Sequence, residues 1–177
     1  MSLHYSTAQV HNLIRQNEQT KKFFYKKISP RFSDCIYDGK IHFSKYFEFF
    51  EMARFDLMHT FYSYLKSKKL DGNKQFGRDK LELGNFIVVR VSFNSYSNLE
   101  LLVKDSVNIK TALIIHQKPL LEFEQIAFTE SNPKPCVKAN IKIAIVNEFF
   151  HKVDNWDHDI LCAMIEFINA YGREDDI

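Results

Sequence analysis

The side chains with the most versatile chemistry gather where a short polar turn runs into a long apolar stretch. The acidic, basic and imidazole groups of this region include Asp34, Asp38, His42, Glu51 and Arg54. Carboxylates and imidazole serve as general bases near neutral pH, and a guanidinium can hold an anionic or carbonyl group. The region therefore has groups suited to proton transfer and to orienting a substrate or a water.

The apolar stretch that carries Glu51 and Arg54 has the periodicity of one long helix. Residues 44–65 contain no Gly or Pro, and at about 100° per residue their large apolar side chains fall on one wide arc. The members of the arc are Tyr46, Phe47, Phe50, Ala53, Leu57, Met58, Phe61, Tyr64 and Leu65. A face this broad predicts a sheet that curves around the helix.

Arg54 projects into the middle of this arc, where a guanidinium must be paired or must reach water. Glu51, one turn earlier in the sequence, is its expected partner. Two interpretations stay open. Arg54 is either part of a structural ion pair, with its stem on apolar surface, or a group that serves a site.

Two adjoining motifs run through the turn and the start of the helix. The pattern R-F-x-D-x-D-x-x-G-x-V-x-N-x-x-Y is matched by Arg31, Phe32, Asp34, Gly39, Ile41 and Tyr46. The pattern Y-x-x-Y-F-E-x-A-R is matched by Tyr46, Phe49 in place of the second Tyr, Phe50, Glu51, Ala53 and Arg54. In this combined register the chain resembles the hotdog-fold acyl-CoA thioesterases of the 4-hydroxybenzoyl-CoA thioesterase-like type. The downstream strand pattern extends the resemblance to about residues 24–146.

One position departs from the family pattern. In the family the second aspartate of D-x-D commonly acts as catalytic base or nucleophile, and Ile36 stands there in this sequence. Hotdog proteins of enediyne polyketide pathways are similar in lacking this carboxylate. The candidates for the missing base are Asp34, Asp38, His42 and Glu51, and the sequence does not choose among them.

The resemblance also implies where a substrate would bind. The N-terminus of the long helix offers unpaired N–H groups and a positive dipole end to a carbonyl oxygen, and Arg54 helps to organise the site. The implied contacts are Gly39, Phe43 through its backbone amide, Tyr46 and Phe50. Cys35 as a thiol nucleophile is the less favoured interpretation, because a free Cys usually packs as a small apolar residue.

The order of elements predicts an α+β protein with the hotdog fold, in which an antiparallel sheet wraps around a long central helix. Helices are expected at 7–22, 44–65 and 157–171, and strands at 23–32, 86–96, 103–115, 120–129 and 137–147. The run Ile87-Val88-Val89 is apolar enough for a central strand. The expected organisation is a domain at 23–150 with a helical extension at 1–22 and a C-terminal helix, within 151–177, packed on it.

Composition excludes several classes of function. The chain has 177 residues, 45% of them hydrophobic, and a formal charge of +2 without a long basic run, so nucleic-acid binding is not expected. Three widely spaced cysteines suit a reducing cytoplasm, and no apolar segment approaches the roughly 18 residues of a membrane span. The acidic and histidine residues of 151–159 are too irregularly spaced for a metal site. Neither a metal nor a cofactor is expected.

The leading hypothesis from the sequence is an acyl thioester hydrolase that acts on an acyl-CoA or acyl-carrier-protein substrate. The alternative is a hotdog protein without hydrolase activity that binds an acyl thioester or takes part in polyketide or fatty-acid biosynthesis. The apolar strand around 87–91 and the resemblance together predict a homodimer, or a tetramer of dimers, with the site at the subunit interface.

Overall fold

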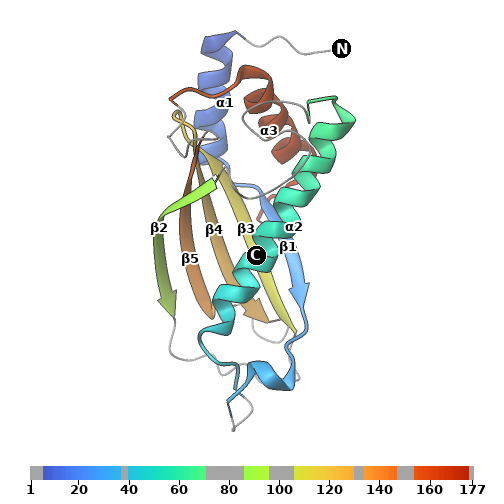
Figure 1. The fold of residues 1–177 in the computed structure, drawn as a ribbon, viewed down its shortest axis with the longest axis vertical. Coiled ribbons are helices and arrows are strands. Elements are labelled where there is room, and N and C mark those ends of the chain that lie inside the picture. Colours follow the sequence, from blue (N-terminus) through green and yellow to red (C-terminus); the bar gives the residue numbers. More distant parts are fainter. Residues whose placement is uncertain are drawn as a thin grey trace.

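The computed structural model describes residues 6–36, 40–70, 86–95, 106–129, 134–146 and 154–175. A five-stranded antiparallel sheet carries the long helix α2 (Lys45–Ser67) across one face (Figure 1). Two further helices, α1 (Thr7–Gln19) and α3 (His158–Tyr171), lie together at one end of the sheet. This arrangement confirms the predicted α+β hotdog architecture.

The sheet has the strand order β1-β3-β4-β5-β2. Its strands are β1 (Phe23–Ile28), β2 (Phe86–Ser95), β3 (Val107–Ile115), β4 (Leu120–Thr129) and β5 (Val137–Ile145). Burial alternates along β4, because successive side chains of a strand point to opposite faces. Leu121, Phe123 and Ala127 are buried, whereas Glu122 and Glu124 are half-buried and pair with lysines.

Helix α2 buries the apolar arc that its periodicity predicts. Tyr46, Phe49, Phe50, Ala53, Leu57, Met58, Phe61 and Leu65 are buried. Glu48, Asp56 and His59 lie on the exposed side, as expected from the same period. Phe47 differs from the prediction, because it is exposed and stacks on Phe93 of the edge strand β2, whereas Leu65, in the same direction on the helix, is buried among residues of α1 and α3. No helix in the described ranges is both long and apolar enough to cross a membrane.

Helices α1 and α3 extend the core beyond the end of the sheet. The buried amide of Asn17 donates to the carbonyl of Leu113 and accepts from the N–H of Ile115, which ties α1 to β3. Helix α3 begins just after its N-cap Asp157, whose side chain accepts from the N–H of Ile160. Both helices join a cluster that includes the C-terminal half of α2.

Strand β2 corrects the prediction of a central strand, because it lies at an edge of the sheet and pairs only with β5 among the described strands. Val88 and Val91 are 53% and 50% exposed. A strand that is apolar on both faces can be a buried central strand or an edge strand that pairs with another chain. The sequence pattern is the same in both cases, so the sequence alone does not separate them.

The opposite edge, at β1, carries the last described residues of the chain. Phe23 and Arg173 exchange two backbone hydrogen bonds, with N···O distances of 2.7 and 3.0 Å. The ammonium of Lys110 lies 2.6 Å from the carboxylate of Asp175 and 4.6 Å from the centre of the Phe23 ring. The segment 172–175 is thus joined to the sheet at Phe23, the first residue of β1, and at Lys110 of β3.

Glu124 links Lys21, in the connection between α1 and β1, to the outer face of the sheet and gives the fold a pH-dependent contact. Burial raises the pKa of this carboxyl, but its hydrogen bonds to Lys21 and Lys138 outweigh that effect and bring the pKa below its usual 4.5. A lowered pKa stabilises the folded state above the usual value, and that stability is lost as the pH falls through the folded-state pKa.

We therefore expect Glu124→Gln to lower the free energy of unfolding at neutral pH by roughly 1 kcal/mol. Urea titrations of both proteins at a series of pH values measure the difference. It should shrink as the pH falls below 4.5, because protonated Glu124 then resembles Gln. A difference that stays constant down to strong acid would contradict the role of the two ion pairs.

Candidate functional site

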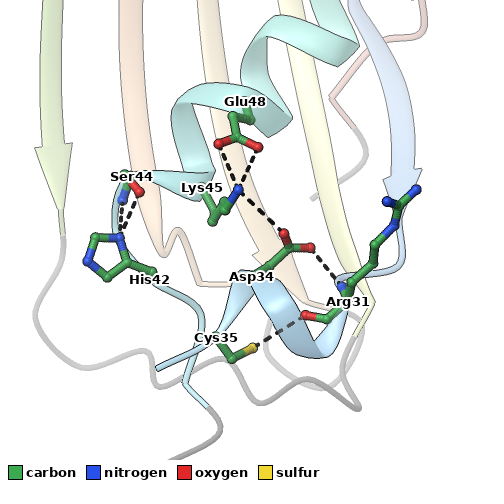
Figure 2. Close-up of polar contacts among 7 residues, drawn as sticks. All are labelled: Arg31, Asp34, Cys35, His42, Ser44, Lys45 and Glu48. Carbon is green, nitrogen blue, oxygen red and sulfur yellow. Dashed lines mark hydrogen bonds and ion pairs between the residues drawn. The ribbon is translucent and has the colours of Figure 1, made fainter. Parts of the chain in front are cut away.

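The turn before α2 brings several predicted residues together, and most of their polar groups are hydrogen-bonded or paired with neighbouring residues of the turn and the helix (Figure 2). The carboxylate of Asp34 accepts from the N–H of Arg31 at 2.7 Å and lies 3.7 Å from the ammonium of Lys45. Its backbone carbonyl accepts from the N–H of His42 at 2.8 Å. Asp34 thereby closes the turn, which leaves it poorly placed to serve as a base.

His42 caps the first turn of the helix. Its ring Nδ1 accepts from the backbone N–H of Ser44 at 3.2 Å and lies 2.7 Å from the Ser44 hydroxyl. Because a backbone N–H only donates, Nδ1 is assigned as the unprotonated nitrogen and the proton of the neutral ring belongs to Nε2. A catalytic role for His42 stays a prediction. The unprotonated nitrogen that a base would use already accepts a hydrogen bond from Ser44.

Phe43 provides an uncommitted donor beside an aromatic surface. Among the described residues, no protein group accepts from its backbone N–H. Its ring lies 4.7 Å from that of Phe93 on β2, and the ring of Phe47 stacks on Phe93 at 4.3 Å. The amide that the resemblance singled out is thus free to meet a carbonyl oxygen.

A second group of predicted residues lines a pocket of about 200 Å³ between α2 and the β2 side of the sheet. The lining residues are Glu51, Arg54, Phe55, Met58, Val88, Leu121, Phe123 and Ile143. Glu51 is exposed and Arg54 is half-buried, whereas Met58, Leu121 and Phe123 belong to the core. The pocket therefore joins an apolar interior to two charged side chains.

Arg54 is held by Gln125, and this corrects the expectation that Glu51 holds it. The guanidinium Nη1 donates to the Gln125 side-chain oxygen at 2.6 Å, and Arg54 makes no ion pair with any described residue. Burial lowers the pKa of Arg54, and the negative charge of Glu51 opposes this from a distance. Glu51 is exposed, so water competes for its carboxylate.

Gln125 is the residue of the site that sequence reasoning missed. It lies in the inward row of β4 with Leu121, Phe123 and Ala127, and its side chain is fully buried. The signal was present, because strict alternation along β4 places an amide in an otherwise apolar row. Such a group requires a polar partner under the helix.

The structure separates the predicted residues into two places. Phe43 lies two residues before α2, and Glu51 lies eight residues after Phe43, a separation of about 12 Å at the helical rise per residue. Tyr46 and Phe50 are on the face of α2 that is buried against the sheet, so their role in substrate binding stays a prediction. Asp38 and Gly39 lie outside the described residues.

The remaining candidates show little reactive chemistry. Cys35 is half-buried and its thiol donates to the carbonyl of Arg31 at 3.8 Å. Burial raises the pKa of the Cys136 and Cys162 thiols to about 11, which disfavours the thiolate. Ile36, at the position of the missing carboxylate, is exposed. The described residues include no cluster of three or more His, Cys, Asp or Glu side chains arranged to hold a metal ion.

No protein-family model and no curated protein matches the sequence. Solved structures do resemble the fold. A predicted thioesterase from Bacillus stearothermophilus is 14% identical with a TM-score of 0.61, and the match covers 81% of this chain and 95% of that one. A thioesterase from Thermus thermophilus, complexed with coenzyme A and Zn, is 17% identical with a TM-score of 0.56 over 80% and 92%.

A third similar structure is a 1,4-dihydroxy-2-naphthoyl-CoA thioesterase from Synechocystis. It is 12% identical with a TM-score of 0.57, and the match covers 80% of this chain and 95% of that chain. At these sequence identities, the similarity shows that the folds are alike. The chain has the hotdog fold of these thioesterases, which confirms at that level the resemblance predicted from the two motifs.

Proposed function

We propose that the protein hydrolyses an acyl thioester of coenzyme A or of an acyl carrier protein. The observation that carries this proposal is the pocket beside α2, in which an apolar lining suited to an acyl group meets Glu51 and Arg54. The names of the structural neighbours and the free N–H of Phe43 support it. The chemistry of the site supports the proposed substrate class, as does one neighbour, which was solved with coenzyme A.

In the proposed reaction, water attacks the thioester carbonyl carbon and the bond to sulfur breaks. Glu51 removes a proton from the water, and the leaving thiolate takes up a proton, so the products are a carboxylic acid and a free thiol. The N–H of Phe43 stabilises the negative charge that develops on the carbonyl oxygen. Glu51 is favoured as base over Asp34 and His42, because the latter two are already hydrogen-bonded within the turn.

Two copies of the chain are needed for this chemistry. Glu51 lies eight residues after Phe43, about 12 Å at the helical rise per residue, which is too far for both groups of one copy to serve one carbonyl. We propose a homodimer, or a tetramer built from dimers, in which the amide of one copy faces Glu51 of its partner. The exposed apolar edge of β2, which borders the pocket at Val88, is the surface through which the copies would join.

Sedimentation velocity is expected to show a dimer or tetramer at micromolar concentration. Val91→Lys places a charge on the exposed edge of β2 and should shift the protein toward monomer and lower turnover. Tyr25→Lys changes an exposed aromatic residue on the opposite edge strand and should leave the assembly intact. A stable monomer with full activity would rule out the shared site.

The alternative function is binding of an acyl thioester without hydrolysis, and the observation in its favour is Ile36 at the position of the usual carboxylate. A panel of acyl-CoA and acyl-carrier-protein thioesters, followed with a thiol reagent, separates the two functions. Release of free thiol at a rate proportional to enzyme supports hydrolysis. Saturable binding with no thiol release would replace the hydrolase with the binding protein.

A further inference from the structure

The partner of Arg54 is neutral, and this has a chemical consequence for the pocket. An acidic partner would cancel the charge of the guanidinium and make the contact a structural ion pair. The Gln125 amide instead accepts one hydrogen bond and leaves the charge in place. Glu51 does not cancel it, because that carboxylate is exposed and makes no ion pair with Arg54.

The surroundings of Gln125 fix the direction of its amide. Its Nε2 donates to the carbonyl of Phe50 at 2.9 Å and to the hydroxyl of Thr111 at 3.1 Å. A carbonyl only accepts and a guanidinium only donates, so only one orientation of the amide satisfies both Phe50 and Arg54. Thr111 lies directly opposite Gln125 in the β3–β4 register and is also buried.

This network holds a cation at a defined place on the pocket wall. Gln125 occupies one N–H of the guanidinium, and no described residue accepts from the others. A half-buried guanidinium with free N–H groups binds a carboxylate best, through paired hydrogen bonds in a region where charges are weakly screened. Arg54 lies three residues beyond Glu51, about 5 Å farther along the helix axis.

We propose that the acyl group of the substrate carries a second carboxylate that binds Arg54, so that the substrate is a thioester of a short dicarboxylic acid, and that Gln125 positions Arg54 for it. This rests on the proposed function, because it places the thioester carbonyl near Glu51. The spacing between Glu51 and Arg54, about one helical turn, suits an acyl chain of about five carbons. The pocket volume of about 200 Å³ also suits a short chain.

The test compares glutaryl-CoA with pentanoyl-CoA, whose five-carbon acyl groups differ at the far end by a carboxylate in place of a methyl group. The full-length protein is expected to favour glutaryl-CoA by about ten- to a hundredfold in kcat/KM, the usual worth of a hydrogen-bonded charge. Equal values for the two substrates, or a preference for pentanoyl-CoA, would overturn the proposal.

Variants assign the preference to the network. Arg54→Met removes the cation, and Gln125→Glu supplies a carboxylate that cancels it, so both should bring the ratio of the two kcat/KM values close to one. Asn108→Asp makes the same change from amide to acid on β3, in the row of side chains that alternates with Thr111, and should keep the ratio. A ratio unchanged in Arg54→Met and Gln125→Glu would place the carboxylate elsewhere and refute the assignment.

Binding separates this inference from the hydrolase proposal. Calorimetry with the thioethers S-(4-carboxybutyl)-CoA and S-pentyl-CoA reports the pocket preference without turnover. Tighter binding of the carboxylated thioether, lost in Arg54→Met, would support the inference even if no thioester is cleaved. Hydrolysis of both thioesters together with equal binding of both thioethers would uphold the hydrolase and overturn the inference. Thermal melting of each variant checks that it is folded.

Discussion

Replacement of Glu51 by glutamine is expected to lower kcat for acyl-thioester hydrolysis by about two to four orders of magnitude, the usual contribution of a general base. The change keeps the size of the side chain and removes its ability to take a proton from water. Glu51 lies on an exposed part of the pocket rim, so the variant should fold like the parent. Thiol release under saturating substrate measures the effect.

Glu48→Gln is the matched control, because Glu48 lies one turn earlier on the exposed side of α2. Its carboxylate pairs with Lys45 at 2.8 Å and lines no part of the pocket, so turnover should change little. Full activity of Glu51→Gln would mean that Glu51 is not the general base and that a residue of the turn before α2 has this role. In that case His42→Ala or Asp38→Asn should show the large loss instead.

The second large effect is expected from Phe43→Pro, which removes a backbone N–H two residues before α2 begins. Loss of one donor to a developing oxyanion typically costs about 10²- to 10³-fold in kcat. Proline is tolerated at the beginning of a helix, where the N–H lacks an intrahelical partner. We therefore expect the thermal stability to change less than the activity.

Phe43→Ala separates the amide from the aromatic ring. It keeps the N–H and removes the contacts with Phe47 and Phe93. Its kcat should stay within about tenfold of the parent, because the proposed role belongs to the backbone. If Phe43→Ala loses as much activity as Phe43→Pro, the ring carries the function and the oxyanion role of the amide is wrong.

The fold was predictable because its main element is encoded locally. The 3.6-residue period of α2 predicted most of its buried and exposed side chains, with Phe47 and Phe49 as exceptions, and the two motifs predicted the turn in front of it. The helix expected at 157–171 and the strands expected at 120–129 and 137–147 also depend mainly on neighbouring residues, and the structure has α3, β4 and β5 at these places. Elements of this kind need no knowledge of distant contacts.

The site was less predictable because its decisive contact is long-range. Arg54 and Gln125 are 71 residues apart, and which inward residue of β4 faces a given turn of α2 depends on how the helix crosses the sheet. Glu51 was the expected partner because helical spacing reveals only neighbours on the same helix. The edge position of β2 was missed for a related reason, since strand order is a property of the whole sheet.

The two edges of the sheet differ in a way that bears on how far assembly can proceed. At β1 the segment 172–175 occupies backbone groups of the edge through the Phe23 and Arg173 hydrogen bonds, while at β2 no described strand covers the outer side (Figure 1). Joining of like edges through a two-fold axis closes on itself, whereas joining of unlike edges would propagate into a filament. In the proposed assembly, the bridge at Phe23 would leave β1 less available than β2 for pairing with another copy. We therefore expect like-edge pairing at β2 to be favoured over open-ended joining of β1 to β2.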